Sequence, residues 1–405
     1  TTNRYEANAD ATLKLSKRWS TSLLAHYENE TKAHDGNDDG FVDIPQVEQY
    51  NVWNRWAYMG DHYVFQAGIK ALSETRTSGQ ANHGGTMHSG DLYKVGIDTE
   101  RYEFFTKNAY IFNKEKNTNL ALILSTTLHN QDATYGRKLY NVDQTYASLM
   151  FETEFNPQNS FSAGVSFNYD AYDQHYRLEN TTDNPLKAFE KEAVPGAYVQ
   201  YTLNLNDKWM VMAGLRGDYS NQHGFFVTPR AHLKYNPNDY VNFRLSAGKG
   251  YRTNHVLAEN NYLLSSSRKV EIAKNLDMEE AWNYGASVST YIPIFGKTLN
   301  VNAEYYYTDF LKQVIVDMDS NPHEVAFYNL DGRSYSHVFQ VEASYPFFKG
   351  FTLTGAYRLT DAKTTYKGER MEKPLTSKYK GLLTASYQTP LGIWQFDATL
   401  QLNGG

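Results

Sequence analysis

The chain has 405 residues, a formal net charge of -6 and no cysteine, which excludes a disulfide framework, a thiolate metal site and a cysteine nucleophile. Its 33 Tyr, 21 Phe and 6 Trp favour strands over helices, and it lacks the clustered basic face of a nucleic-acid-binding protein. The longest clear apolar run, Leu120 to Leu124, is far shorter than the roughly 18 residues of a membrane-spanning helix.

Apolar and polar residues alternate from the beginning of the chain. Ala7, Ala9, Ala11 and Leu13 occupy alternate positions with polar residues between them, and the alternation resumes after a short turn at residues 16–18. A period of two indicates strands with one apolar and one polar face. The strands of a transmembrane β-barrel have this pattern, with apolar residues facing lipid and polar residues facing the lumen.

Short turns and long polar connections follow one another along the chain. Turn-forming residues recur near positions 60, 115, 157, 207, 237, 295, 349 and 390. Long connections are predicted at 30–46, 75–90, 130–139, 173–191, 249–275 and 362–375, with shorter ones at 222–228 and 317–324. This count predicts about eighteen strands. The alternation is typical of an outer-membrane barrel with short periplasmic turns and long extracellular loops; a β-sandwich, solenoid or propeller is the alternative.

Aromatic residues flank the short turns. A row of rings at one end of the strands predicts an interfacial girdle, with ring bodies in lipid and polar edges at the headgroups. Its predicted members are Trp19, Tyr58, Tyr63, Phe112, Phe155, Phe161, Trp209, Tyr235, Tyr240, Phe347, Phe351, Tyr387 and Trp394.

The two ends of the chain bear on domain organisation. A barrel pairs its first strand with its last so that no strand edge meets hydrocarbon. The final residues, 402–405, resemble the entry to another loop and lack the terminal aromatic residue of outer-membrane barrels. We therefore expect residues 1–405 to form one domain, a partial transmembrane antiparallel β-barrel.

Two motifs lie on either side of one long connection. Residues 250–254, Gly-Tyr-Arg-Thr-Asn, resemble the FRAP-type box of TonB-dependent outer-membrane receptors. Residues 275–279, Asn-Leu-Asp-Met-Glu, with Trp282 and Gly285, resemble the NLxPE...ExG box that follows it. Thr253 and Asn254 replace the usual Ala and Pro, and Met278 stands where Pro is common. The chain thus resembles the barrel portion of this family, of the Bacteroidetes-like siderophore or cobalamin type.

The resemblance implies a fold, a location and a function. The family's barrels have about 22 strands around an N-terminal plug, so this sequence would lack the plug, the TonB box and roughly four strands. The implied activity is energised import of a ferric siderophore, haem or cobalamin across the outer membrane of a Gram-negative bacterium, without catalysis. The implied partners are the TonB complex, acting through the plug, a small-molecule chelate, outer-membrane lipid and a surface lipoprotein, but no nucleic acid.

Polar and aromatic residues on the long connections are the candidate ligand- or plug-facing residues, because binding groups gather on loops. Aromatic rings there suit stacking on a large ligand, although they suit packing between loops equally well. Haem receptors of the family carry a histidine between the two motifs, but His255 lies only three residues beyond Arg252. The candidates are Arg252, Asn254, His255, Glu259, Tyr262, Tyr172 and Tyr176.

Residues 35–43 have the DxNxDG pattern of a calcium loop. Side-chain oxygens of four residues and one backbone carbonyl occupy ligand positions, with Gly40 permitting the sharp turn. Gln46 replaces the bidentate Glu at the twelfth position, so weak affinity is expected. A solvated acidic loop is the other interpretation. The predicted ligands are Asp35, Asn37, Asp39, Phe41 and Asp43.

A histidine pair offers a second metal or haem site. His83 and His88, with Met87, have ligand types that such centres accept. Ordinary polar surface is the other interpretation of this segment.

Three other functions remain open. A passive porin-like channel would have no plug, and a polysaccharide-importing TonB-dependent receptor would have larger loops. An outer-membrane enzyme or adhesin on a smaller barrel would bring nucleophile, base and orienting group together on one rim.

Overall fold

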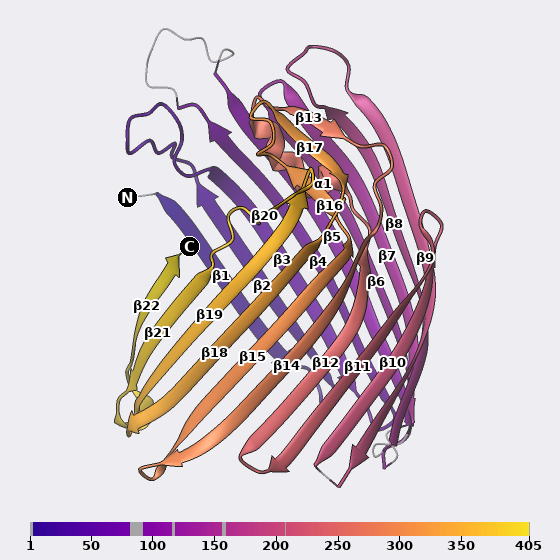
Figure 1. Cartoon of the computed structure of the whole chain (residues 1–405), viewed down its shortest axis with the longest axis vertical. Helices are drawn as coiled ribbons and strands as arrows, with labels where there is room; N and C mark the ends of the chain where they lie inside the picture. Colours follow the sequence, from indigo (N-terminus) through magenta and orange to yellow (C-terminus); the bar gives the residue numbers. More distant parts are fainter. Residues whose placement is uncertain (1–2, 82–91, 116–117, 156–158, 207, 405) are drawn as a thin grey trace.

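The computed structural model of the chain describes residues 3–81, 92–115, 118–155, 159–206 and 208–404. A 19-stranded antiparallel sheet curls around a lumen, with short turns at one end and longer connections at the other (Figure 1). We call these the turn end and the loop end. Apart from the four-residue β20 (Glu369–Glu372), its members are long strands that run from end to end, so the predicted eighteen strands are confirmed.

Successive wall strands pair antiparallel with one another in chain order. They are β1 (Arg4–Lys14), β2 (Trp19–Glu30), β3 (Gln46–Met59), β4 (Tyr63–Gly79), β5 (Lys94–Asn113), β6 (Thr118–Tyr135), β7 (Lys138–Phe155), β8 (Asn159–Arg177), β9 (Leu186–Leu205), β10 (Trp209–Ser220), β11 (Gly224–Asn238), β12 (Val241–Arg252), β14 (Glu279–Ile294), β15 (Lys297–Lys312), β18 (Ser334–Phe348), β19 (Phe351–Tyr366), β21 (Tyr379–Gln388) and β22 (Gln395–Gly404).

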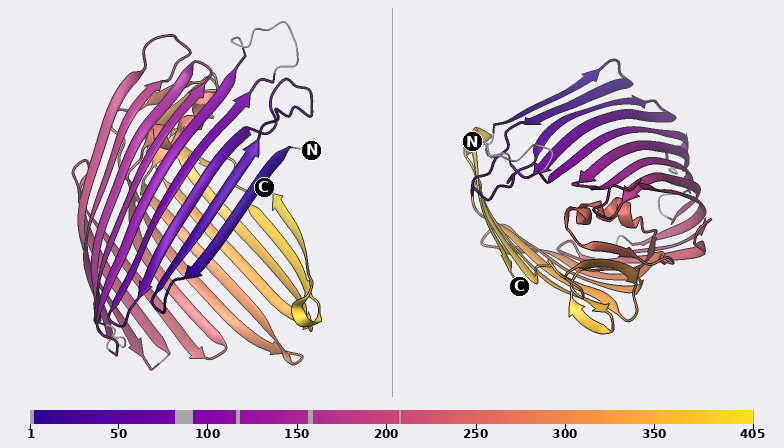
Figure 2. Two further views of the ribbon diagram at one scale, coloured as in Figure 1. Left: turned by 180° about the vertical axis from the view of Figure 1, so that it is seen from behind. Right: turned by 90° about the horizontal axis from the view of Figure 1, so that it is seen from above.

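The first and last strands lie on the same side of the barrel (Figures 1 and 2). Within the described residues, β1 pairs with β2 and β22 pairs with β21, and no pairing joins β1 to β22. The expectation that 1–405 is part of a larger barrel stays a prediction.

The loop end carries a small second layer of structure. It comprises helix α1 (Val256–Asn260), the 3-10 turn η1 (Asn261–Ser265) and a three-stranded sheet of β13 (Lys269–Ile272), β16 (Val314–Asp317) and β17 (Glu324–Asn329). A further 3-10 turn, η2 (Pro390–Gly392), lies between β21 and β22. None of the described helices is both long enough and apolar enough to cross a membrane.

The two faces of the wall differ as the alternation predicts. The outward face exposes apolar side chains such as Ile69, Phe104 and Phe339. At the turn end, rings pack against one another, including Trp19 on Tyr58 at 5.1 Å and Trp209 on Tyr235 at 3.9 Å between centroids. This contact pattern supports the predicted aromatic girdle.

Several predicted connections differ from the structure: 222–228 shrinks to 221–223, and 317–324 is part of a longer connection, 313–333, that carries β16 and β17. Residues 130–139 are not a loop, because β6 and β7 continue to a tight turn at Gly136 and Arg137, with Tyr135 paired to Lys138. Gly136 adopts a φ of 63° there, a conformation that glycine accepts readily. The predicted connection 173–191 shrinks to 178–185. Beyond the lipid the outward face of β6 and β7 is mostly polar and their inward face packs on the second layer of structure, so the alternation changes phase and does not continue the pattern of the lipid-facing part.

An apolar core lies at the loop end, where the wall meets the second layer. It combines wall residues of β6, β7 and β8 with residues of η1, β13, β16 and β17, which are far apart in the sequence. Its buried members are Ala133, Tyr135, Tyr140, Val142, Tyr172, Leu264, Val270, Val314, Val325 and Phe327.

Candidate functional site

The connection between β12 and β14 folds into the mouth of the barrel at the loop end. Seen from above, α1 lies inside the ring of wall strands (right view of Figure 2). The Tyr135 hydroxyl donates to the Asn261 side-chain oxygen at 2.7 Å. The buried Lys138 ammonium donates to the carbonyls of Ser266 and Arg268 at 2.9 and 2.8 Å. These bonds satisfy a buried charge and attach the connection to β6 and β7.

His255 attaches the same connection to β8 and β9. Its ring stacks on that of Tyr172, with 4.1 Å between centroids, and its Nδ1 lies 3.5 Å from Glu190 Oε2. Glu190 also accepts a hydrogen bond from Gln174 Nε2 at 3.1 Å. Tyr172 is only 7% exposed, so it and His255 face each other rather than the open lumen.

Arg252, at the tip of β12, joins two carboxylates. It forms an ion pair with Glu259 of α1 and lies 3.6 Å from Glu279, the first residue of β14. It also donates to the Asn254 side-chain oxygen at 3.4 Å. The two motifs of the sequence therefore meet at this arginine. Its side chain is 57% exposed, which leaves it accessible from the mouth.

The two remaining aromatic candidates lie in different surroundings. Tyr176, on β8, packs against the apolar core, whereas Tyr262 is 58% exposed. The structure thus brings Arg252, Asn254 and Glu259 together and joins them to His255, whose amide donates to Glu259 Oε1 at 3.3 Å and whose ring stacks on Tyr172. Tyr262 and Tyr176 lie apart from this group. A direct role in ligand binding stays a prediction for each of these residues.

A cavity of about 810 Å³ opens at the loop end between the tip of the β12–β14 connection and the β6–β7 turn. We call it the loop-end cavity. Its described lining contains two cations, Lys94 and Arg137, and three aromatic rings, but no carboxylate. The lining consists of Phe41, Gln80, Leu92, Tyr93, Lys94, Thr134, Tyr135, Gly136, Arg137, Asn180, Leu264, Ser265, Ser266 and Ser267.

In the predicted calcium loop, the side-chain oxygens accept hydrogen bonds from backbone amides of the same loop. Asp35 accepts from the amides of Asp39 and Gly40, Asp39 accepts from Phe41, and Asp43 accepts from Gly36. Asn37 accepts from the Asp39 amide at 3.3 Å. These are the local side-chain bonds of an acidic turn. The oxygen types suit calcium, and calcium binding stays a prediction.

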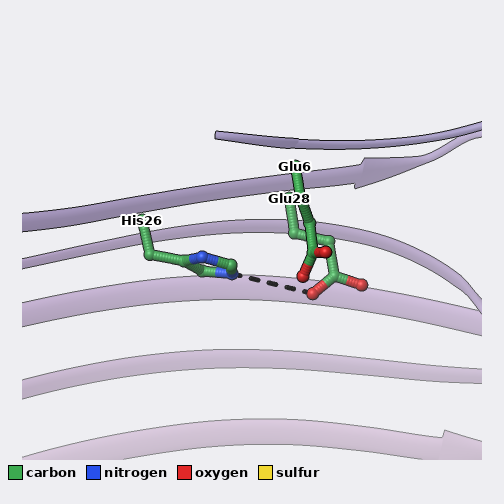
Figure 3. A group of neighbouring side chains, drawn as sticks. All are labelled: Glu6, His26 and Glu28. Carbon is green, nitrogen blue, oxygen red and sulfur yellow. Dashed lines mark ion pairs between the residues drawn. The ribbon is translucent and has the colours of Figure 1, made fainter. Parts of the chain in front are cut away.

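A different group of possible metal ligands lies on the lumen side of β1 and β2. Glu6, His26 and Glu28 point toward one another (Figure 3), and within the described ranges only this trio of His, Asp or Glu side chains has its donor atoms within 4.8 Å. Arg4 lies 3.0 Å from Glu6 and 3.2 Å from Glu28. Because a cation already bridges the two carboxylates, the group is an ion-pair network.

The segment with His83 and His88 lies outside the described residues. Sequence reasoning did not single out Lys138, Glu190, Lys94 or Arg137. Lys138 and Glu190 lie on strands at places that were interpreted as loop, and only the strand register shows that they face inward.

A wall of lipid-facing strands, an aromatic girdle at the turn end and a connection folded into the mouth define an outer-membrane barrel of the receptor type. The TonB dependent receptor-like, beta-barrel family matches residues 1–405. The chain belongs to this family of outer-membrane receptors of Gram-negative bacteria, which are not enzymes. The resemblance stated from residues 250–254 and 275–279 is therefore confirmed.

Solved receptor structures share the fold at low identity. FpvA of Pseudomonas aeruginosa bound to pyoverdines has a TM-score of 0.72 at 12% identity, over 100% of this chain and 60% of that one. The ferric enterobactin receptor PfeA of the same organism has 0.71 at 9%, over 99% and 65%. The alcaligin receptor FauA of Bordetella pertussis has 0.66 at 14%, over 99% and 66%.

The chain thus spans 60% to 66% of these three structures. None of the curated proteins matches the chain in sequence.

Proposed function

We propose that the complete receptor imports an anionic ferric chelate of the siderophore class across the outer membrane, energised by the TonB complex acting through a plug. The observation that carries the choice of ligand is the loop-end cavity, with two cations, three aromatic rings and no carboxylate in its described lining. A surface lipoprotein is a further proposed partner.

The cavity lining suits a bulky anion with aromatic character. A volume of about 810 Å³ lies within the range of small-molecule sites. Arginine and lysine attract negatively charged oxygen ligands, and the planar guanidinium of Arg137 can bind two such oxygens at once. Tyr93, Tyr135 and Phe41 offer ring faces or edges for stacking. The names of the three similar structures, all of siderophore receptors, support the same class.

Haem is less well supported than a siderophore. His255 would be the candidate axial ligand, but its side chain is only 14% exposed and its ring is stacked on Tyr172, which leaves no room for a porphyrin on that face. Cobalamin carries one phosphodiester anion and, as cyanocobalamin, no net charge, so it offers Lys94 and Arg137 less negative charge than a ferric tris-catecholate does. Both compounds are therefore comparison ligands in the test.

The connection folded into the mouth favours a gated receptor over the porin alternative. Residues 253–278 lie inside the ring of strands and are attached to it by Lys138, Tyr135 and His255. Such a connection narrows the entrance of the barrel, and the match of residues 1–405 to the TonB dependent receptor-like barrel family supports the receptor over the porin. The polysaccharide-importing alternative predicts a neutral, hydroxyl-binding lining in place of Lys94 and Arg137.

The test uses the full-length receptor. Equilibrium binding is measured for a ferric tris-catecholate, a neutral ferric hydroxamate, haem, cyanocobalamin and a neutral oligosaccharide, and ⁵⁵Fe uptake is measured with and without TonB. We expect the anionic chelate to bind most tightly and Arg137→Gln to weaken that binding roughly tenfold. Lys380→Gln is the matched control, because Lys380 lies on β21, away from the cavity. Uptake that persists without TonB would establish the porin alternative.

A further inference from the structure

The outward face of the barrel carries a cluster of cations at the loop end of β18, β19 and β20. We call Arg333, Tyr335, Lys363 and Arg370 the outer basic patch. Tyr335 pairs with Lys363 across β18 and β19, and Thr365 pairs with Arg370 across β19 and β20. The patch does not belong to the loop-end cavity, because the residues that line the cavity all lie between positions 41 and 267.

The height of the patch follows from the register of three adjacent strands. Tyr305, Phe339 and Leu359 form one outward row and are 42%, 41% and 44% exposed. Two rows closer to the loop end, Asp309, Tyr335 and Lys363 lie side by side. A change from apolar to charged side chains within four residues of a strand marks the boundary between hydrocarbon and headgroups.

The row between these two consists of Tyr307, His337 and Asp361. Tyr307 and His337 are stacked at 4.7 Å, and His337 meets Tyr335 edge to face at 5.1 Å. Such rings are typical of the interfacial zone of a membrane protein. This second aromatic band lies at the opposite end of the wall from the girdle beside the short turns.

Arg333 is held in place before any ligand arrives. Its backbone amide donates to Thr365 Oγ1 at 3.0 Å, and its carbonyl accepts from the same hydroxyl at 2.8 Å. Its guanidinium donates to the Tyr307 hydroxyl at 3.0 Å, lies 3.8 Å from Asp309 and covers the Tyr335 ring at 5.3 Å. The side chain is nevertheless 61% exposed, so donors remain free to bind an outside group.

Arg370 approaches the same ring. Its guanidinium lies 5.9 Å from the centre of Tyr335, and it forms no ion pair with another described residue. Lys363 and Lys378 have acidic neighbours, Asp361 at 3.4 Å and Glu372 at 3.0 Å. Two arginines that share one ring, with one carboxylate between them, leave positive charge unneutralised on the outward surface.

The basic character is local to this part of the rim. On β5 to β8 the corresponding outward positions beyond the apolar band include four aspartates. Asp98 stands directly opposite Asp132, and Asp143 stands opposite Asp173. The patch is therefore not a general property of the loop end.

We infer that the outer basic patch binds the phosphate groups of a lipid in the cell-surface leaflet of the outer membrane. The loop end of such a barrel faces the cell surface, and the patch lies at headgroup height on its lipid-facing side. One arginine guanidinium can bind two phosphate oxygens at once. The guanidinium groups of Arg333 and Arg370 both lie near the Tyr335 ring and bind the phosphate oxygens. The outward row of Tyr305, Phe339 and Leu359, closer to the centre of the membrane, contacts the acyl chains of the same lipid.

The test measures lipid binding to the full-length receptor in nonionic detergent by native mass spectrometry. The probes are lipid A with two phosphates and the same lipid after removal of both. We expect the phosphorylated probe to bind, and the double variant Arg333→Gln/Arg370→Gln to weaken that binding roughly tenfold or more. The variant Arg333→Lys, which keeps the charge but loses the guanidinium, is expected to give an intermediate affinity.

A matched control lies on β19 and the neighbouring strand β21. Arg358 and Lys380 face each other across β19 and β21 on the lumen side, so Arg358→Gln/Lys380→Gln removes the same charge and should leave lipid binding unchanged. An equal loss in this control, or equal binding of both lipid probes by the unaltered receptor, would overturn the inference. Displacement of the lipid by millimolar inorganic phosphate would reassign the patch to free anions. Electrophoretic mobility with and without heating checks that each variant is folded.

Discussion

The imidazole of His255 lies on the phenol ring of Tyr172, with 29° between the ring planes. Tyr172 belongs to the wall strand β8, whereas His255 belongs to the connection that carries α1. The stack therefore joins the two parts of the mouth, and Glu190 on β9 strengthens it from the side. The docking of α1 inside the barrel depends on this contact together with the bonds made by Lys138.

Replacing His255 by alanine tests that dependence. An aromatic pair contributes about 1 kcal/mol beyond the area it buries, so His255→Ala should lower the hydrogen-exchange protection of the α1 amides about fivefold. The Glu259 amide, bonded to the His255 carbonyl at 2.9 Å, is the reporter. Tyr262→Ala, which truncates an exposed ring in the same connection, should have little effect. Equal protection in both variants would show that α1 is held without the stack.

A glycine in β9 makes room for an ion pair on the lumen wall. A Cβ added to Gly196 would lie 1.9 Å from Asp218 Oδ1 and 2.7 Å from Arg216 Nη2, where Arg216 Nε donates to Asp218 at 2.7 Å. Gly196→Ala should therefore destabilise the barrel by about 1–3 kcal/mol, measured by urea unfolding in detergent. In the control Gly250→Ala the new Cβ meets no atom within 4 Å, and its stability should match that of the parent. A Gly196→Ala protein as stable as Gly250→Ala would contradict the geometry.

The wall could be predicted from the sequence because each strand carries its own signal. The alternation at Ala7, Ala9 and Ala11 needs no knowledge of any other strand, and the turns between strands are local as well. The ends of β6 and β7 near the Gly136 turn escaped detection because the apolar face changes sides there: Ala133, Tyr135, Tyr140 and Val142 face inward onto the loop-end core, whereas most outward positions are polar.

The mouth could be predicted only in part. The two motifs indicated that residues 250–254 and 275–279 lie together, and Arg252 does approach Glu279. The contacts of His255 with Tyr172 and of Lys138 with Ser266 join residues far apart in the chain, and no periodicity reports such pairs. The same limit applies to the outer basic patch, because the convergence of Arg333 and Arg370 on Tyr335 depends on the register of three strands.

Asp317 gives the small sheet at the loop end a dependence on pH. Burial alone would raise the pKa of Asp317, but hydrogen bonds from Ser320 and Tyr328 outweigh it and hold the pKa below its ordinary value. The Ser320 amide and the Tyr328 hydroxyl each donate at 3.0 Å. A depressed pKa stabilises the folded state above the unfolded value of about 3.9, and this stabilisation is lost as the pH falls through the folded value.

Acidification should therefore loosen residues 313–330 before the wall. Protease cleavage of this segment should be slow from pH 7 to about pH 5 and accelerate as the pH drops below about 4. It is measured with a neutral protease at higher pH and an acid protease at lower pH, each rate being divided by that of an unfolded reference peptide at the same pH. Asp317→Asn should be cleaved faster at pH 7 and show no further acid step. Asp277→Asn is the control, since Asp277 is half exposed and 3.6 Å from Lys312. Retention of the acid step in Asp317→Asn would assign it to another group.

The acidic loop at residues 35–43 allows a direct test of calcium binding. Its oxygens have the type and spacing of a calcium loop, but the closing Glu is Gln46 and the carboxylates bond to nearby amides. Calcium must replace those bonds, so we expect a dissociation constant of about 10⁻⁴–10⁻³ M by titration calorimetry of the full-length receptor. Asp39→Ala removes a predicted ligand and should abolish the heat, whereas Asp38→Asn removes the same charge beside the predicted ligands and should not. Identical titrations of the parent and Asp39→Ala would leave the segment an ordinary acidic turn.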